Sequence, residues 1–305
     1  MIDLRRLQVL RAIQRHGSVT AAAQAMHLTP SAASQQVRQL SHDLGVALLR
    51  PRGRGVELTP AAHTLLTHAD AIHARWEQAQ SDLRGHAEQA ADSVQVCGFA
   101  TAVSALLAPA VAEVGSAEPQ LTVRIQEAEP AECFDLLFAE EADAAIVQAV
   151  PGDAPPSDAS FDVQPLLDDP LDLLVPVVHP LADERNVSLD AAAREPWVLG
   201  AVGGSSQQIV EVACSAAGFS PAIAHHAVDW GAVCALVAEG LGVALVPRLA
   251  RLPAQHPAVR VPLRGDPTPS RRILTATRRG GRDHPAVRRV LAAVEQQAAR
   301  LRADA

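Results

Sequence analysis

The residues whose spacing carries the clearest chemistry lie between positions 29 and 38. Four polar side chains recur there at i, i+3, i+4 and i+7: Ser31, Ser34, Gln35 and Arg38. This spacing places them on one face of an α-helix. Together they offer hydrogen-bond donors and acceptors and one positive charge, and no carboxylate among them would repel a phosphate. Such a face is suited to the major groove of DNA, where base edges and phosphates are the binding partners.

The other side of this segment is apolar. Its hydrophobic residues recur at i, i+4, i+7 and i+11: Ala33, Val37, Leu40 and Leu44. Thr29 followed by Pro30 is a helix start, because a hydroxyl N-cap and a proline at the first helical position both suit an N-terminus. Gly45 is suited to end the helix. We therefore expect a helix that packs by one face and exposes the other.

Two shorter helices are expected before it. Apolar residues at helical spacing mark the first one: Leu4, Leu7, Leu10 and Ile13. Ser18 can cap the second, whose alanines leave a surface small enough for another helix to approach closely. Three residues are expected to fill the core beneath the third helix: Val46, Leu48 and Leu49. These elements predict a helix-turn-helix unit.

A basic turn follows this unit. Arg50, Arg52 and Arg54 lie around a glycine-containing turn between two short extended segments. One interpretation is a solvated surface hairpin. Because a helix-turn-helix lies beside it, we favour a wing whose arginines contact phosphates or the minor groove.

Thr59 and Pro60 repeat the cap-plus-proline start. In the helix that follows, apolar residues recur in alternating steps of three and four: Ala62, Leu65, Ala69, Ile72, Trp76, Ala79 and Leu83. This pattern is typical of a coiled coil, with packing against its own domain as the alternative. A helix of about 28 residues is roughly 40 Å long and would project from a compact head. We expect a dimerisation arm that places two heads on a two-fold axis, which suits an inverted-repeat DNA site.

Strands alternate with helices after position 85. The predicted strands are 94–99, 120–126, 144–147, 171–175, 196–199, 222–227, 242–246 and 272–277. Helices are expected at 103–113, 134–140 and 285–302, and crossings between lobes at 163–167 and 262–270. The alternation predicts an α/β fold with a parallel, doubly wound sheet. Two lobes joined by two crossings leave a cleft, which is a natural small-molecule site.

The predicted domain organisation has three parts. Residues 1–59 form a winged helix-turn-helix, 60–90 a linker or dimerisation helix, and 91–305 a two-lobed effector-binding domain. Lobe I is expected to comprise 91–161 and 268–305, and lobe II 162–267.

Charge is divided unevenly along the 305 residues. Residues 1–62 carry eight arginines against three acids, a net charge of +5. The rest of the chain carries −13, which gives the total of −8. A basic head on an acidic body is the pattern of a DNA-binding module joined to another domain.

Four cysteines are scattered without metal-ligand spacing, which fits a reducing compartment: Cys97, Cys133, Cys214 and Cys234. The first residues lack the apolar run of a signal peptide. No stretch approaches about 18 uninterrupted apolar residues, the length of a membrane span. We expect a cytoplasmic protein without a membrane segment or a cofactor.

These motifs resemble those of LysR-type transcriptional regulators. The similarity is strongest over residues 4–59, with TAAAQAMHLTPSAASQQVRQL and DLGVALLRPRGRGVELTPA, and continues through EADAAI, HPLA and EGLGVALVP. Ser41 and Ala62 depart from the family's usual glutamate and glycine, but both lie outside the base-reading face. The resemblance implies a dimeric linker helix, often a tetramer, and a periplasmic-binding-protein-like effector domain. RNA polymerase is a further candidate partner.

The resemblance also implies DNA contacts. They fall on Thr29, Pro30, Ser31, Ser34, Gln35, Arg52 and Arg54. The residue pattern adds Arg38 as a phosphate or guanine contact. Gln35 is the candidate for direct base readout, because a carboxamide can pair bidentately with adenine.

The family's effector site lies between the lobes, at the end of the first strand and at the loop that opens a second-lobe helix. Here these positions are Phe99, Ala100, Thr101, Ala102, Gly203, Gly204, Ser205 and Ser206. Both segments precede a helix, whose N-terminal N–H groups and dipole attract an anion. Ser205 and Ser206 could equally be helix caps. We expect a carboxylate to contact Thr101 and one of these serines, with Glu127 or Gln148 binding a polar tail.

The sequence leaves two alternative functions to consider. An enzyme is disfavoured, because the chain has no Gly-x-Ser-x-Gly, no His-Glu-x-x-His and no phosphate- or dinucleotide-binding glycine motif. A redox- or metal-responsive regulator would use Cys214 and Cys234 or the adjacent His225 and His226. Core packing is the simpler interpretation for the cysteines, and neighbouring histidines on a strand point to opposite faces.

Overall fold

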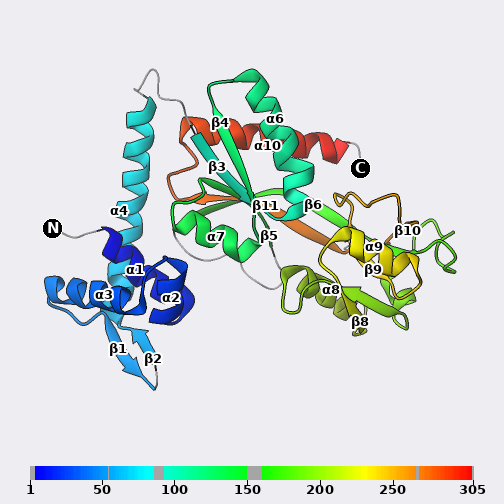
Figure 1. Cartoon of the computed structure of the whole chain (residues 1–305), viewed down its shortest axis with the longest axis horizontal. Helices are drawn as coiled ribbons and strands as arrows, with labels where there is room; N and C mark the ends of the chain where they lie inside the picture. The colour runs from blue at the N-terminus through cyan, green and yellow to red at the C-terminus, as the bar shows by residue number, and fades with distance from the viewer. Residues whose placement is uncertain (1–3, 54, 86–92, 150–159, 266–267, 304–305) are drawn as a thin grey trace.

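The computed structural model describes residues 4–53, 55–85, 93–149, 160–265 and 268–303. The N-terminal head consists of three helices and a hairpin (Figure 1): α1 (Leu4–His16), α2 (Val19–Ala25), α3 (Pro30–Leu44), β1 (Leu49–Arg52) and β2 (Gly55–Leu58). The two strands pair antiparallel, with Leu49 opposite Leu58.

The helices of the head begin and end at the expected residues. Ser18 Oγ accepts a hydrogen bond from the Ala21 amide at 3.1 Å, which caps α2. Gly45 ends α3 with a φ of 67°, a left-handed conformation that glycine adopts without strain. The predicted apolar stripe of α3 is buried at Ala33, Val37 and Leu40. Val46 was expected in the core, but it is 44% exposed because the chain turns there between α3 and β1.

A long helix, α4 (Pro60–Gly85), follows the head. Its N-terminus is capped by Thr59, whose Oγ1 accepts a hydrogen bond from the Ala62 amide at 3.2 Å. The predicted heptad residues fall into two groups. Ala62 and Ala69 are buried in the core of the head, whereas Ile72 and Trp76 are 49% and 50% exposed. The Leu83 side chain lies outside the part that the structure describes.

The body is built on a seven-stranded mixed sheet in the order β10-β6-β11-β5-β3-β4, with β9 also pairing with β6. The strands are β3 (Ser93–Gly98), β4 (Thr122–Glu127), β5 (Ala144–Ala149), β6 (Phe161–Pro176), β9 (Ala244–Pro247), β10 (Ala258–Pro262) and β11 (Ser270–Arg278). Strands β4, β3 and β5 are parallel, but β11 runs antiparallel to β5 and β6. The expected parallel arrangement is thus confirmed for β3, β4 and β5 but is wrong for β6 and β11, because the chain re-enters lobe I from the opposite direction. Strand β10 was not anticipated.

Helices cover this sheet and complete lobe I (Figure 1). They are α5 (Ala100–Ala102), a π-helical turn (Val103–Leu107), α6 (Ala108–Ala117), α7 (Pro130–Phe138) and α10 (Pro285–Ala303). Lobe II adds a short 3₁₀ helix (Leu189–Ala192), β7 (Pro196–Leu199), α8 (Ser205–Ala216), β8 (Ala222–His226) and α9 (Trp230–Ala238). Strands β7 and β8 pair parallel as a separate small sheet.

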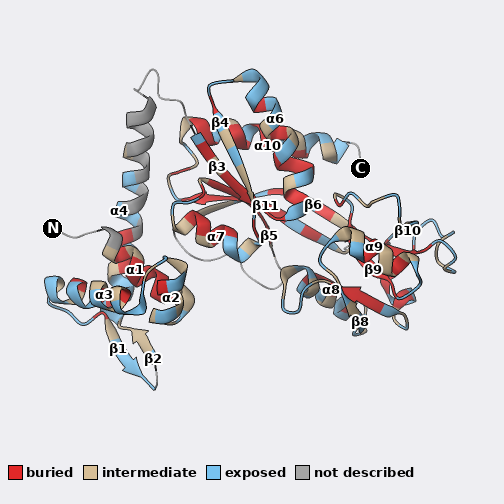
Figure 2. Cartoon of the chain, viewed as in Figure 1, coloured by how far each residue is buried: buried red, intermediate tan, exposed pale blue. Residues whose placement is uncertain are grey.

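Strand β6 joins the lobes. Its first part pairs with β11 up to Pro170, and from Leu171 onward it pairs with β9 and β10. The predicted crossing at 163–167 and the predicted strand at 171–175 are thus one continuous element. Separate hydrophobic cores lie in the two lobes, with buried residues shown in red in Figure 2.

One helical stretch, Ala100–Ala117, is long and apolar enough to cross a membrane by composition alone, with a mean hydropathy of 1.4. It is interrupted by Thr101, Ser104 and Glu113. Its buried side chains, Leu106 and Leu107 among them, pack in the core of lobe I. The apolar face is therefore already covered within the domain.

Candidate functional site

The polar face of α3 is open to solvent. Ser31, Gln35 and Arg38 are exposed, and Ser34 is partly buried. Thr29 is the N-cap, and its Oγ1 accepts a hydrogen bond from the Ala32 amide at 3.2 Å. The first turn holds no acidic residue. Because the first N–H groups of a helix lack intrahelical partners, this end can also hold a phosphate.

The wing presents two arginines held by one carboxylate. Arg50 Nε donates to Glu57, and Arg52 Nη1 lies 3.1 Å from Glu57 Oε2. The arginine side chains remain 61% and 78% exposed. Glu57 therefore orients both guanidinium groups and leaves one net positive charge among the three. Arg54, the third predicted wing cation, lies outside the described residues.

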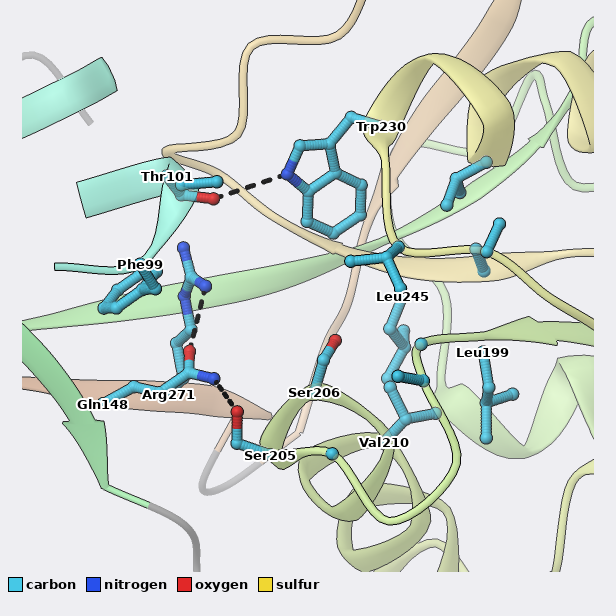
Figure 3. Close-up of a pocket in the computed structure, with 18 of the residues that line it drawn as sticks. Phe99, Thr101, Gln148, Leu199, Ser205, Ser206, Val210, Trp230, Leu245 and Arg271 are labelled. Carbon is cyan, nitrogen blue, oxygen red and sulfur yellow. Dashed lines mark hydrogen bonds between the residues drawn. The ribbon is translucent and has the colours of Figure 1, made fainter. Parts of the chain in front are cut away.

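A second candidate site is a cavity of about 230 Å³ between the lobes. Lobe I contributes residues from the start of α5, from β5 and from β11: Phe99, Thr101, Gln148 and Arg271 (Figure 3). Lobe II contributes residues that follow β7 or lie on α8, α9 and β9: Gly200, Ser205, Ser206, Val210, Trp230 and Leu245. At Gly200 an added Cβ would lie 3.1 Å from Ser206 Cβ, so glycine lets this loop approach α8 closely.

A chain of polar contacts runs through this cleft. Arg271 Nε donates to Asp169 Oδ2 at 2.9 Å, and its Nη1 donates to Gln148 Oε1 at 3.1 Å. Gln148 Nε2 in turn donates to Ser205 Oγ at 2.7 Å, across the gap between the lobes. The chain connects β6, which carries Asp169, to the first turn of α8.

A second bridge joins the lobes. Trp230 Nε1, at the start of α9, donates to Thr101 Oγ1 at 3.4 Å (Figure 3). Two helix N-termini meet this space, and neither N-cap residue, Phe99 or Gly204, makes a side-chain capping hydrogen bond. No capping side chain therefore occupies the first N–H groups of these helices, which can donate to a ligand in the cavity.

Burial controls the charges in the cleft. Arg271 is 5% exposed, and its guanidinium lies over the Phe99 ring at 4.9 Å from the centroid. Loss of hydration lowers the pKa of Arg271 and raises the pKa of Asp169, and the attraction between them opposes both shifts. The pair is a buried ion pair whose positive member faces the cavity.

The cavity gathers most of the expected effector residues. Seven of them line it: Phe99, Ala100, Thr101, Gln148, Gly204, Ser205 and Ser206. Ala102, Glu127 and Gly203 do not appear in its lining. The N-cap of α8 is Gly204, so Ser205 and Ser206 do not occupy the cap position.

Several lining residues escaped sequence reasoning, notably Glu129, Arg271 and Trp230. Gly200 and Ala227 directly follow β7 and β8, and ligands of α/β folds bind outside the carboxyl ends of strands, so this rule could have found them. Arg271 follows no motif, because its partners Asp169 and Gln148 are more than 100 residues away in sequence.

Among the described residues, the side chains named for the redox or metal alternative are not arranged for either role. Cys214 and Cys234 are both fully buried, and they belong to different core clusters. The part of the chain that the structure describes holds no group of three or more histidine, cysteine, aspartate or glutamate residues arranged to hold a metal.

A winged helix-turn-helix joined by a long helix to a two-lobed α/β domain with a ligand-sized cleft defines a DNA-binding regulator that responds to a small molecule. The chain belongs to the LysR family. Residues 4–63 match the bacterial regulatory helix-turn-helix of that family, and residues 87–299 match the LysR substrate binding domain.

The curated relatives of this chain include transcriptional regulators. The RuBisCO operon transcriptional regulator of Allochromatium vinosum is 28% identical over 245 residues, 80% of this chain and 79% of the relative. A probable hydrogen peroxide-inducible genes activator of Mycobacterium avium is 28% identical over 281 residues, 91% and 88% of the two chains. These relatives regulate transcription, and this chain is a regulator and not an enzyme.

Solved structures share the fold. Full-length BenM superposes with a TM-score of 0.59 at 22% identity, covering 98% of each chain. Full-length CbnR in complex with its target DNA superposes with a TM-score of 0.56 at 22% identity, covering 97% of this chain and all of that one.

Proposed function

We propose that this regulator reads an inverted-repeat DNA site as a homodimer and that a small carboxylate with an apolar body binds between its lobes. On DNA, the exposed face of α3 supports base contacts by Gln35, with Ser31, Ser34 and Arg38 beside it. Thr29 and the wing arginines would contact phosphates, and Pro30, which has no N–H to donate, would make van der Waals contact only. The half-exposed Ile72 and Trp76 on α4 support dimerisation.

The proposal extends to the assembly and its location. Dimers of a two-lobed regulator can associate into a homotetramer, and RNA polymerase is the partner through which DNA binding would change transcription. A DNA-binding regulator of this family acts where the chromosome is, in the cytoplasm.

The convergence of two uncapped helix N-termini and Arg271 on one cavity carries the effector proposal. Asp169 already offsets the charge of Arg271, so the preference for an anion depends mainly on the helix ends. Thr101 and Ser206 offer hydroxyl groups to the carboxylate, while Leu199, Val210 and Leu245 would surround the apolar body (Figure 3).

Calorimetry with a panel of small carboxylic acids, each beside its neutral amide, tests this. Two helix ends worth about 0.5–1 kcal/mol each correspond to a roughly 5- to 30-fold preference for the acid. Thr101→Ala should abolish the heat, whereas Ser116→Ala, on the exposed surface of α6, should not change it. Amides that bind as tightly as their acids would contradict the proposal.

A response to hydrogen peroxide, the inducer in the name of the Mycobacterium avium relative, is disfavoured for this chain. The four cysteines are buried, and no observation on this chain favours a redox response.

A further inference from the structure

The head contacts lobe I through the side of α1 that faces α7. Arg15 lies at the centre of this contact. Its guanidinium carbon is 5.6 Å from the Phe134 ring centroid and 5.4 Å from that of Phe161, and its Nε is 3.0 Å from Asp135 Oδ1. The two rings meet edge to face at 5.1 Å. Only 19% of the Arg15 side chain is exposed. A cation held by two aromatic rings and a carboxylate is a specific contact.

Further polar contacts surround Arg15. Arg11 Nη1 donates to Ser160 Oγ of lobe I at 2.7 Å, and its Nη2 donates to the Leu66 carbonyl of α4 at 2.9 Å. Gln8 Nε2 donates to Glu140 Oε1 at 2.8 Å. Arg11 is only 7% exposed. Because a buried guanidinium needs hydrogen-bond acceptors, separation of the head from lobe I would remove one that Arg11 now uses.

An aromatic side chain connects the two hydrophobic cores. Phe138, the last residue of α7, packs against the core of the head and also against the core beneath α7. Charge is complementary as well, since Arg15 of the head pairs with Asp135 of lobe I at 3.0 Å. Apolar, aromatic and ionic contacts therefore coincide on one surface.

This contact leaves the functional faces of the head open. On α3, Gln35 and Arg38 are exposed, and on α4 the side chains of Ile72 and Trp76 remain half exposed. In Figure 1, α3 and the β1–β2 hairpin lie on the side of the head away from α7. The contact therefore leaves these side chains accessible to DNA or to a second copy of the chain.

We propose that Arg15, Phe134, Asp135, Phe138 and Phe161 form a head-docking surface that fixes the orientation in which α3 meets DNA. A head attached only through α4 could tilt relative to the body. A docked head presents α3 at one angle, so in a dimer the docking also fixes the distance between the two recognition helices. Phe161 is the first residue of β6, so the head rests on the strand that joins the lobes.

Docking is tested first without DNA, by hydroxyl-radical labelling and mass spectrometry of the full-length protein. Arg15→Ala and, independently from the lobe side, Asp135→Asn should increase the labelling of Phe138 and Phe161 several-fold. Arg6→Ala is the matched control, because Arg6 lies on the same helix but pairs with Asp43 inside the head at 2.7 Å. Labelling that stays at the wild-type level in both test variants, or rises equally in the control, would overturn the docking surface.

The second measurement concerns orientation and rests on the proposed inverted-repeat reading. The probe is a duplex selected by the wild-type protein from random-sequence DNA, compared with the same duplex lengthened by about five base pairs between half-sites, roughly half a helical turn. The wild type should discriminate strongly between the two. Arg15→Ala should lose about tenfold of that discrimination, within the range of interdomain coupling, and Arg6→Ala should retain it.

The two measurements separate the possible failures. Increased labelling with unchanged spacing discrimination would overturn the claim that docking orients the head. Failure of the wild type itself to discriminate spacing would refute both the orienting role and the inverted-repeat reading, whereas the labelling result would stand by itself.

Discussion

At the scale of single residues, Gln35 and Arg52 should affect DNA binding in different ways. Gln35 is exposed on α3, and its carboxamide can make two hydrogen bonds to adenine. Gln35→Ala should therefore change which sequence is preferred and cost about 1–3 kcal/mol on the best site. Titrations against every single-base variant of a selected operator would measure this preference.

Arg52→Ala is the comparison for Gln35→Ala. Arg52 is 78% exposed on the wing and is suited to contact a phosphate. Its removal should weaken all sequences equally and reduce the slope of log affinity against log salt by about one. If Gln35→Ala also weakened every sequence equally, its role in base reading would be refuted.

The contrast between Gln35 and Arg271 shows what spacing alone can reveal. A helix converts local spacing into a face, so the polar residues of α3 could be grouped from the sequence. Arg271 meets Gln148 and Asp169 only because β11 pairs with both β5 and β6, and nothing local encodes that pairing. The resemblance to the family predicted the pocket segments at Phe99 and Ser205. It did not predict Arg271, the charged residue that lies between them.

At the scale of elements, the two halves of α4 have different roles. Ala62 and Ala69 pack into the head, as expected if the helix packs against its own domain. Ile72 and Trp76 are left half exposed, as expected for a coiled coil. The double variant Ile72→Ser with Trp76→Ser should be monomeric by sedimentation equilibrium, because burial of these side chains drives pairing. Its affinity for a two-half-site duplex should fall by about 10²-fold, as the second head no longer binds with it.

Ala71→Ser is the control for this double variant, since Ala71 is exposed on the same helix but lies outside the heptad pattern. It should remain dimeric. A double variant that still sedimented as a dimer would remove α4 as the dimerisation element.

Strand β6 shows why an element can be divided wrongly in a sequence. Pro165 and Pro170 lie within it, and prolines inside a run argue against a strand because they cannot donate to the ladder. The structure accommodates Pro165 with a register shift opposite Ile273 and Leu274. The helix boundaries set by Thr29, Gly45 and Thr59 were predicted correctly because capping is a local interaction.

At the scale of the whole molecule, the cysteines lie in both lobes and are shielded in each. Cys97 and Cys133 are buried in lobe I, and Cys214 and Cys234 in lobe II. The pKa of Cys133 is raised, mainly by a hydrogen bond with Cys97 and to a smaller extent by burial. Burial raises the pKa of Cys214 to about 12 and also raises that of Cys234. Because the thiolate is the reactive form, the native fold should protect these residues from oxidants.

Thiol titration with an aromatic disulfide reagent at about pH 8 should therefore find no fast-reacting cysteine in the native protein, and all four in guanidinium chloride. A raised folded pKa means that ionisation favours unfolding. The contribution of Cys214 to stability is thus complete below about pH 8.5, the unfolded value, and is lost as the pH rises through about 12.

Operator binding should be the same before and after mild peroxide. A peroxide effect on DNA binding that a Cys214→Ser or Cys234→Ser variant abolished would instead establish a redox response. It would require local opening of the lobe II core in which these thiols are buried.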